Sequence, residues 1–187
     1  MGVPSGFTLL EDERPVWRSR MSFKANWGLI LLGILFLLFS AALPPLIIFA
    51  IIIFLIVALR VIATEYFITN KRIYVKYGII SRKVFEIKNE WITGVMVRQG
   101  IIGRILNYGD IIYSTPGQYA GSVIMIGVSD PMHIRTIVED VLRKNKEAER
   151  IREKIRELEK EYEFGRISPE KYEELRKKYD EELKKYL

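Results

Sequence analysis

Basic side chains gather in one part of the chain and are its strongest candidates for binding chemistry. Between residues 60 and 144 there are 12 Lys and Arg against 7 Asp and Glu, which accounts for most of the net charge of +6. Each such cation near an anionic lipid leaflet contributes about 1 kcal/mol of attraction. The candidates for contact with lipid headgroups are Lys71, Arg72, Lys76, Arg82 and Lys83. The alternative for these residues is an ordinary solvated strand edge.

Residues that could support catalysis or hold a metal are few. The 187 residues contain no Cys and a single histidine, His133, so thiolate catalysis is excluded and a His-rich metal site is hard to build. No phosphate-binding glycine motif is present. The carboxylates Glu65, Glu86, Glu90 and Asp110 are dispersed along the region of predicted strands, without the spacing of an acid–base pair. We therefore expect no enzymatic activity, no cofactor and no metal.

A long uncharged stretch determines where the segments before and after it lie. The 35 residues Ala25–Leu59 contain no Asp, Glu, Lys or Arg. At about 1.5 Å per residue, one straight helix of this length would greatly exceed a hydrocarbon core of roughly 30 Å. Pro44 and Pro45 interrupt it near the middle. The sequence therefore predicts two transmembrane helices, Ala25–Leu43 and Leu46–Thr64, joined by a tight turn at these prolines.

The flanks of this stretch indicate its orientation. Arg14, Arg18, Arg20 and Lys24 precede it and Arg60 ends it, whereas the turn carries no charge. The positive-inside rule then places both termini and the following domain in the cytoplasm, on a two-pass protein of the cell membrane. A signal peptide is excluded because the stretch starts late and is too long. A buried core helix would need a much larger surrounding domain.

The composition of the residues that follow indicates short antiparallel strands. They are rich in β-branched and aromatic residues and are punctuated by Gly, Asn and Pro. Turns at Asn70–Lys71 and at Gly78 indicate a meander. Gly100, Gly103 and Gly109 frame a short helical turn. The predicted strands are Glu65–Thr69, Arg72–Tyr77, Arg82–Lys88, Ile92–Arg98, Asp110–Ser114 and Ser122–Ile126.

The sequence predicts a helix after the last strand. Asp130 and Pro131 suit its start, and Ile134, Ile137 and Val138 begin an apolar stripe. Residues 65–144 therefore predict an α+β domain, an antiparallel and partly open β-barrel capped by a C-terminal helix. Residues 1–24 form an N-terminal segment that could add a strand to it.

The pattern of this region resembles a known family. It is similar to the bacterial and archaeal membrane proteins with a pleckstrin-homology (PH)-like domain that were called DUF304, the YdbS and YdbT type of the bPH2 group. The resemblance covers residues 10–144 and implies the fold and the membrane topology, whereas the biochemical role of the family is largely undefined. It is carried by Thr69–Ile73, Gly78–Arg82, Val97–Gly109 and Ser129–Pro131.

The tail, residues 145–187, is predicted to be helical. It contains 13 basic and 13 acidic residues. Gly165 stops a first helix, and Ser168 with Pro169 starts a second. The stretch 158–187 resembles the short C-terminal motif called SHOCT. Both helices carry a narrow apolar seam that should pack within the tail or on another chain, and its residues are candidates for oligomerisation. They are Ile151, Ile155, Leu158, Tyr162, Tyr172, Leu175, Tyr179 and Leu183.

These features predict a non-catalytic, membrane-anchored PH-like scaffold or adaptor. We expect it to contact membrane lipids, to form a homo-oligomer and to dock an unidentified protein partner. The first alternative is a sensor of anionic lipid headgroups. The second is a small pore or transport subunit, which the nearly apolar helices support weakly. Nucleic acid is not an expected partner, because the aromatic residues belong to membrane boundaries and strands.

Overall fold

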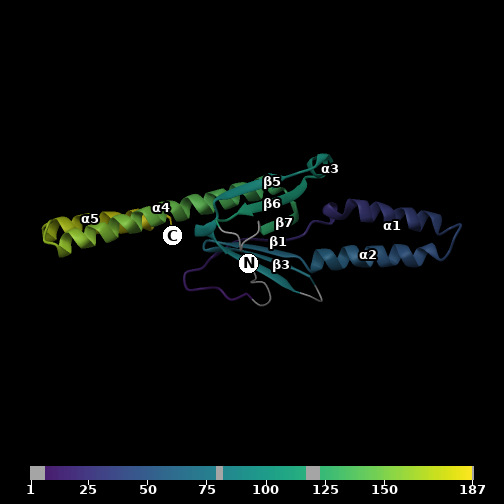
Figure 1. Ribbon diagram of the computed structural model, residues 1–187, viewed down its shortest axis with the longest axis horizontal. Coiled ribbons are helices and arrows are strands. Elements are labelled where there is room, and N and C mark those ends of the chain that lie inside the picture. Colours follow the sequence, from purple (N-terminus) through teal and green to yellow (C-terminus); the bar gives the residue numbers. More distant parts are fainter. Residues whose placement is uncertain (1–6, 79–81, 117–122, 187) are drawn as a thin grey trace. The chain divides into compact units, whose positions relative to one another are not determined.

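The computed structural model of the protein describes residues 7–78, 82–116 and 123–186. The chain forms two compact units, Met1–Val138 and Glu139–Leu187. Residues 79–81, which follow the predicted turn at Gly78, and Ser122 at the start of the last predicted strand lie outside the described residues. Figure 1 gives the order of the elements along the chain.

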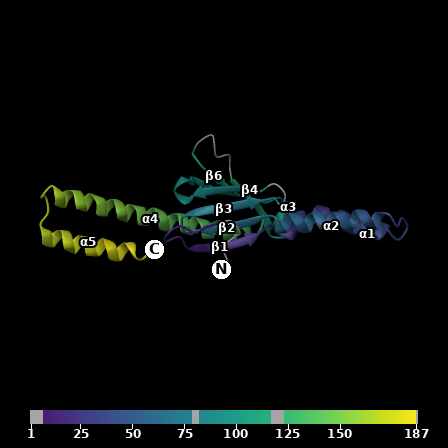
Figure 2. The same cartoon turned by 90° about the horizontal axis from the view of Figure 1, so that it is seen from below.

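Two antiparallel sheets form the body of the first unit. Sheet A has the order β1-β2-β3-β4 and sheet B the order β5-β6-β7, so the strands do not close into one barrel. Figure 2 shows sheet A with its four strands in sequence order. The N-terminal segment supplies β1, which pairs with β2. The strands are β1 (Pro15–Arg20), β2 (Glu65–Thr69), β3 (Arg72–Tyr77), β4 (Lys83–Lys88), β5 (Gly94–Arg98), β6 (Tyr108–Ser114) and β7 (Val123–Ser129).

Strand β2 is buried along its whole length because both of its faces are covered. Tyr66 and Ile68 lie in the main core of the unit. On the opposite face Phe67 pairs with Tyr74 of β3, and Phe7 packs edge-on against both rings at centroid distances of 5.1 and 5.0 Å. The N-terminal segment therefore covers the outer face of sheet A before it enters β1.

The apolar stretch forms a helical hairpin between β1 and β2. After the 3₁₀ helix η1 (Phe23–Asn26) come α1 (Trp27–Phe39) and α2 (Leu46–Ile62). The first predicted helix, Ala25–Leu43, is too long, because residues 23–26 are 3₁₀-helical and residues 40–45 form the turn before Leu46. The second starts at Leu46 as predicted and ends at Ile62, two residues before Thr64. Among the described residues, no helix combines the length and the apolarity that crossing a membrane requires.

The start of the hairpin is attached to sheet B through Gly127. This strand residue has φ +63° and its carbonyl oxygen accepts a hydrogen bond from Ser22 N at 2.8 Å. A Cβ atom on Gly127 would lie 2.4 Å from the Cβ of Ala25 in η1. Only glycine therefore permits this approach without a shift of the backbone.

The second unit contains most of helix α4 (Pro131–Glu163) together with α5 (Pro169–Leu183). Helix α4 runs unbroken through the predicted domain boundary at residue 144. Gly165, at φ +68°, ends it, and Ser168 Oγ accepts from Lys171 N at the start of α5, as predicted. Tyr162 stacks on Tyr172 at 4.5 Å and Lys154 Nζ lies 5.8 Å from the Tyr179 ring, so the two helices pack antiparallel.

Replacement of Gly127 by Ala should destabilise the first unit. The positive φ costs about 1–2 kcal/mol and the overlap with Ala25 about 1–3 kcal/mol more. Gly100→Ala is the matched control, because a Cβ there meets nothing within 4 Å and φ is −74°. Thermal unfolding of the full chain in detergent measures both variants. Equal melting temperatures for the two would contradict the role of this contact.

Candidate functional site

The direction of the strands determines which residues lie at the hairpin end of sheet A. Strand β1 leads into the hairpin at Arg20 and β2 leaves it at Glu65, and these two residues are paired. Glu65 in turn faces Lys76 of β3, and Tyr77 faces Lys83 of β4. The hairpin end therefore carries the end of β3 and the start of β4.

Exposed cations surround this end of the sheet and the base of the hairpin. We call them the basic rim: Arg20, Lys24, Arg60, Arg82 and Lys83, all exposed. Two of the five residues predicted to contact headgroups, Arg82 and Lys83, belong to the rim. The other three residues of the rim, Arg20, Lys24 and Arg60, come from β1, η1 and the last turn of α2, which are distant in the sequence from Arg82 and Lys83.

Lys76 lies at the hairpin end but is engaged with a buried carboxylate. Its Nζ is 3.5 Å from Glu65 Oε2, and Arg18 and Arg20 approach the other oxygen at 3.1 and 3.6 Å. Burial alone would raise the pKa of Glu65, but the hydrogen bond from Arg18 and the charge of Lys76 outweigh it and the pKa is lowered. The ammonium of Lys76 therefore serves this internal ion pair.

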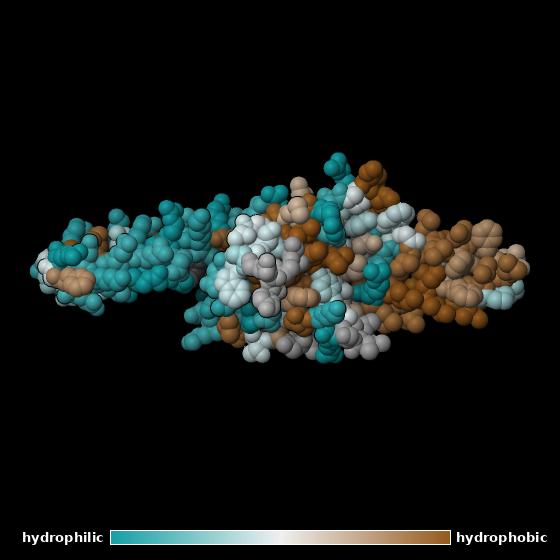
Figure 3. Space-filling view, viewed as in Figure 1, coloured by the Kyte–Doolittle hydropathy of each residue, from teal (hydrophilic) through white to brown (hydrophobic). Residues whose placement is uncertain are grey.

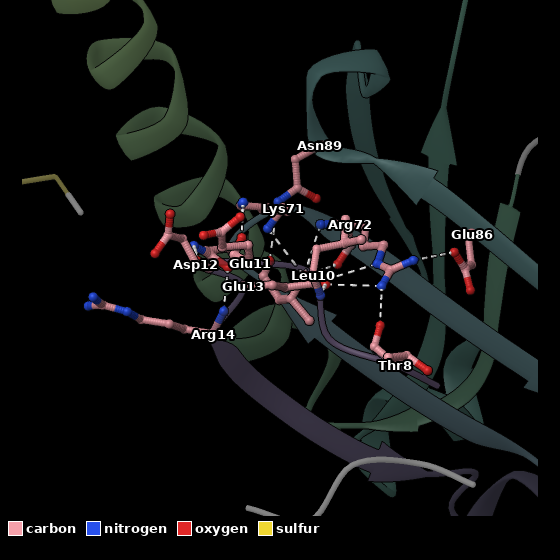
Figure 4. A network of polar contacts seen from close by, with 12 residues as sticks. Thr8, Leu10, Glu11, Asp12, Glu13, Arg14, Lys71, Arg72, Glu86 and Asn89 are labelled. Carbon is pink, nitrogen blue, oxygen red and sulfur yellow. Dashed lines mark hydrogen bonds and ion pairs between the residues drawn. The ribbon is translucent and has the colours of Figure 1, made fainter. Parts of the chain in front are cut away.

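Lys71 and Arg72 lie at the opposite end of sheet A, in the network of Figure 4. Arg72 donates to Glu13 from Nε and Nη2, both at 3.0 Å, and to Glu86 Oε2 at 2.7 Å. Lys71 donates to the carbonyl oxygen of Glu11. Lys71 and Arg72 therefore tie the N-terminal segment to the turn between β2 and β3, and their contact with lipid stays a prediction.

A pocket of about 430 Å³ opens at the base of the hairpin. Met21, Ile56, Leu59 and Ile126 supply an apolar lining, while Arg60 and Tyr77 add polar groups. Burial raises the pKa of Tyr77 to about 12, with a smaller contribution from Asp110, so its phenol stays protonated at neutral pH. The pocket therefore has an apolar wall and, beside it, Arg60 of the basic rim.

The predicted oligomerisation residues lie in the helical hairpin of the second unit. Ile151, Ile155 and Leu158 are buried on α4, whereas Tyr162 is exposed and the four residues on α5 are half-buried. Arg176 of α5 also forms an ion pair with Glu159 of α4. The seam is therefore largely closed within the chain, and oligomerisation through it stays a prediction.

Among the residues that the structure describes, chemistry-bearing side chains outside the ion pairs do not gather into a centre. His133 is exposed in the first turn of α4. Within residues 7–78, 82–116 and 123–186, no group of three His, Asp or Glu side chains could hold a metal ion. The arrangement at the hairpin end suits binding of an apolar and anionic surface.

Comparisons with known proteins address the fold. The profile of the family described as "bPH_2: Bacterial PH domain" matches residues 22–159. The chain is also similar to a crystal structure of a DUF1696 family protein with a pleckstrin-homology domain from Shewanella loihica PV-4. The two share 19% identity over 44% of this chain and 74% of that one, with a TM-score of 0.35. No curated protein matches the chain. The family match agrees with the PH-like fold predicted above and leaves the SHOCT-like tail untested.

Glu13→Gln should destabilise the first unit and make its free energy of unfolding less dependent on pH in acid. Burial alone would raise the pKa of Glu13, but hydrogen bonds from Arg72, Leu10 N and Thr69 lower it below its usual 4.5. The carboxylate therefore stabilises the fold above its unfolded pKa, and the contribution is lost as pH falls through the lower folded pKa. Breaking this buried pair should cost about 2–4 kcal/mol at pH 7.

Unfolding by denaturant at several pH values measures this effect. The difference between wild type and Glu13→Gln should shrink as the pH falls below about 4. Glu90→Gln, at a side chain that is 65% exposed, is the control and should change little. A difference that stays constant into acid would contradict the assignment.

Proposed function

Because the chain belongs to the bacterial PH domain family, we propose that it is a non-catalytic binding module held at a lipid bilayer by the α1–α2 hairpin. A PH-like domain suggests a binding or scaffold role, although a fold alone does not identify the ligand. The observation that carries the proposal is the exposed apolar surface of the hairpin. Figure 3 shows this surface as a continuous hydrophobic region over α1 and α2.

The exposed surface of the hairpin is apolar on every side. Leu31, Leu38, Ile48 and Leu55 are among many large apolar side chains exposed on α1 and α2, and neither helix contains an ionisable residue before Arg60. Soluble monomers rarely expose contiguous apolar patches of more than a few hundred Å². Lipid supplies the missing cover. In the proposed arrangement the hairpin enters the bilayer from the face where the sheet lies and returns to that face.

The basic rim supports the same orientation. Its five cations surround the base of the hairpin, where the headgroups of the leaflet would be. Cytoplasmic leaflets are commonly anionic, and Lys and Arg beside membrane segments favour that side. We therefore place the domain on the cytoplasmic face of the cell membrane. A role as a sensor of anionic lipid is the second candidate, favoured by the pocket that joins an apolar wall to Arg60.

Docking of a protein partner forms a further part of the proposal. Strand β4 is an edge of sheet A, and its Val84 and Phe85 are exposed. An exposed edge with apolar side chains can accept an added strand from another chain. A pore has less support, because the hydroxyl of Ser40 in the hairpin turn already donates to Leu37 O at 2.6 Å.

Charges placed on the hairpin should abolish membrane association. Leu35→Asp with Ile51→Asp introduces two carboxylates on exposed positions of α1 and α2. Each costs about 2.5–3.5 kcal/mol inside a bilayer. The full chain should float with phosphatidylcholine–phosphatidylserine vesicles in a density gradient, and the variant should remain at the bottom. Val84→Asp with Phe85→Asp on β4 is the control and should float. Unchanged flotation of the hairpin variant would refute the anchor.

Neutralising the rim should weaken binding only where lipid is anionic. For Arg82→Gln with Lys83→Gln we expect a roughly tenfold to thirtyfold weaker affinity for vesicles with phosphatidylserine, since each rim cation contributes about 1 kcal/mol. Affinity for phosphatidylcholine vesicles should not change. Arg14→Gln with Lys88→Gln removes the same charge at the other end of sheet A and is the matched control. Equal losses for both pairs would show that net charge, and not the rim, attracts the lipid.

A further inference from the structure

Two isoleucines on the short helix α3 (Ile101–Ile105) face solvent. Ile101 is 83% exposed and Ile105 is 76% exposed, the highest values for large apolar side chains in the part of the chain that the structure describes. Their spacing of four residues puts them on one face of the helix. Both belong to the sequence segment that carries the family resemblance, but the function proposed above assigns them no role.

The exposure of these residues is built into the fold. A Cβ on Gly103 would lie 2.7 Å from Tyr108 O, so glycine allows α3 to lie directly on the start of β6. The side-chain amide of Gln99 donates to Tyr108 O at 3.0 Å and to Gly103 O at 3.4 Å. Asn107, with φ +52°, turns the chain into β6. Helix α3 is therefore held in place while its two isoleucines point away from the domain.

Helix α3 lies at the hairpin end of the first unit. It connects β5 to β6 beside the pair Arg98–Asp110. Asp110 Oδ1 accepts from Gly127 N at 2.9 Å, and Gly127 O accepts from Ser22 N in front of η1. Both views of the chain show α3 beside the base of the hairpin. In Figure 3 a small hydrophobic patch occupies the position of α3, separate from the larger surface of the hairpin.

We propose that Ile101 and Ile105 insert into the headgroup boundary of the bilayer and form a second membrane contact beside the hairpin. This inference rests on the proposed function, because it takes the hairpin to be embedded in lipid. Arg104, exposed on the same helix, matches an anionic surface and continues the basic rim. Apolar residues with a neighbouring cation are typical of interfacial membrane contacts.

The second contact determines how the domain is oriented. A hairpin alone permits rotation of the domain about its own axis and tilting toward the bilayer. Contact at α3, on one side of the hairpin base, removes most of this freedom. Sheet A then presents its β4 edge at a defined height above the lipid, as docking of a partner at that edge requires.

Site-specific labelling tests the inference on the full chain. The chain contains no Cys, so single substitutions by Cys accept a nitroxide label without background. The labelled positions are Ile101, Ile105, Leu38 in α1 as the hairpin reference, and Ser114 at the far end of β6 as the aqueous reference. Each label in phosphatidylcholine–phosphatidylserine vesicles is exposed in turn to oxygen, which partitions into lipid, and to a water-soluble nickel chelate.

Labels at residues 101 and 105 should be relaxed more by oxygen than by nickel, as at residue 38 and in contrast to residue 114. If residue 38 is in lipid while residues 101 and 105 behave like residue 114, the second contact is overturned and the hairpin anchor stands. If residue 38 is in water, the proposed function fails, whatever the other labels report. Protection of residues 101 and 105 from both reagents would indicate a protein interface and would also overturn the inference.

A partition measurement provides the second test. Ile101→Gln with Ile105→Gln should reduce the affinity for these vesicles by about tenfold or more, because a buried isoleucine contributes roughly a factor of ten. Trp91→Gln, at a side chain that is 53% exposed and remote from α3, is the control and should bind like wild type. Equal affinity of the double variant and wild type would overturn the inference. Unchanged melting temperatures ensure that the variants are folded.

Discussion

Antiparallel pairing of β1 with β2 is the constraint on which the rest of the first unit depends. The chain leaves sheet A at Arg20 and returns at Glu65, and these residues are direct partners. Neighbouring strands lie about 4.8 Å apart, so the inserted residues must begin and end almost at one point. Two antiparallel helices satisfy this condition. Gly33 permits their close packing, since a Cβ there would lie 3.0 Å from Phe54.

Sheet A buries one carboxylate near each of its ends, and this divides its cations into two groups. Glu65 at the hairpin end engages Arg18 and Lys76, while Glu13 at the other end engages Arg72. Cations in these pairs satisfy buried charge, because an unpaired carboxylate would be costly in the interior. Arg20 also approaches Glu65, at 3.6 Å, whereas the other exposed rim cations, Lys24, Arg60, Arg82 and Lys83, remain available to an external anionic surface. A count of Lys and Arg along the sequence therefore overstates the charge that the domain can present to a ligand.

Local patterns predicted most strands, the start of α4 and the break between α4 and α5 well, because alternation, turn residues and caps act between near neighbours. Glu65–Thr69 and Arg72–Tyr77 were predicted with the bounds that the structure has. The candidates for lipid contact were chosen by taking position along the chain for distance from the hairpin, and their contact with lipid stays a prediction. Strand β2 runs away from the hairpin and β3 returns, so Lys71 is remote although it closely follows α2. No local pattern links Glu13 to Arg72 across 59 residues. An isolated glycine within a strand, such as Gly127, is a signal of close backbone approach that could have been used.

Gly127 also connects the two proposed membrane contacts. Its N–H is held by Asp110, which follows the turn after α3, and its carbonyl oxygen accepts from Ser22, which precedes α1. A change in the tilt of the hairpin relative to sheet B would break the second bond and separate Ala25 from the glycine. The two bonds measure 2.9 and 2.8 Å and the contact leaves no space for a Cβ, so η1 and the α3 end of sheet B should behave as one body. The two membrane contacts would then orient the domain together, because this joint holds them in a fixed relation to each other.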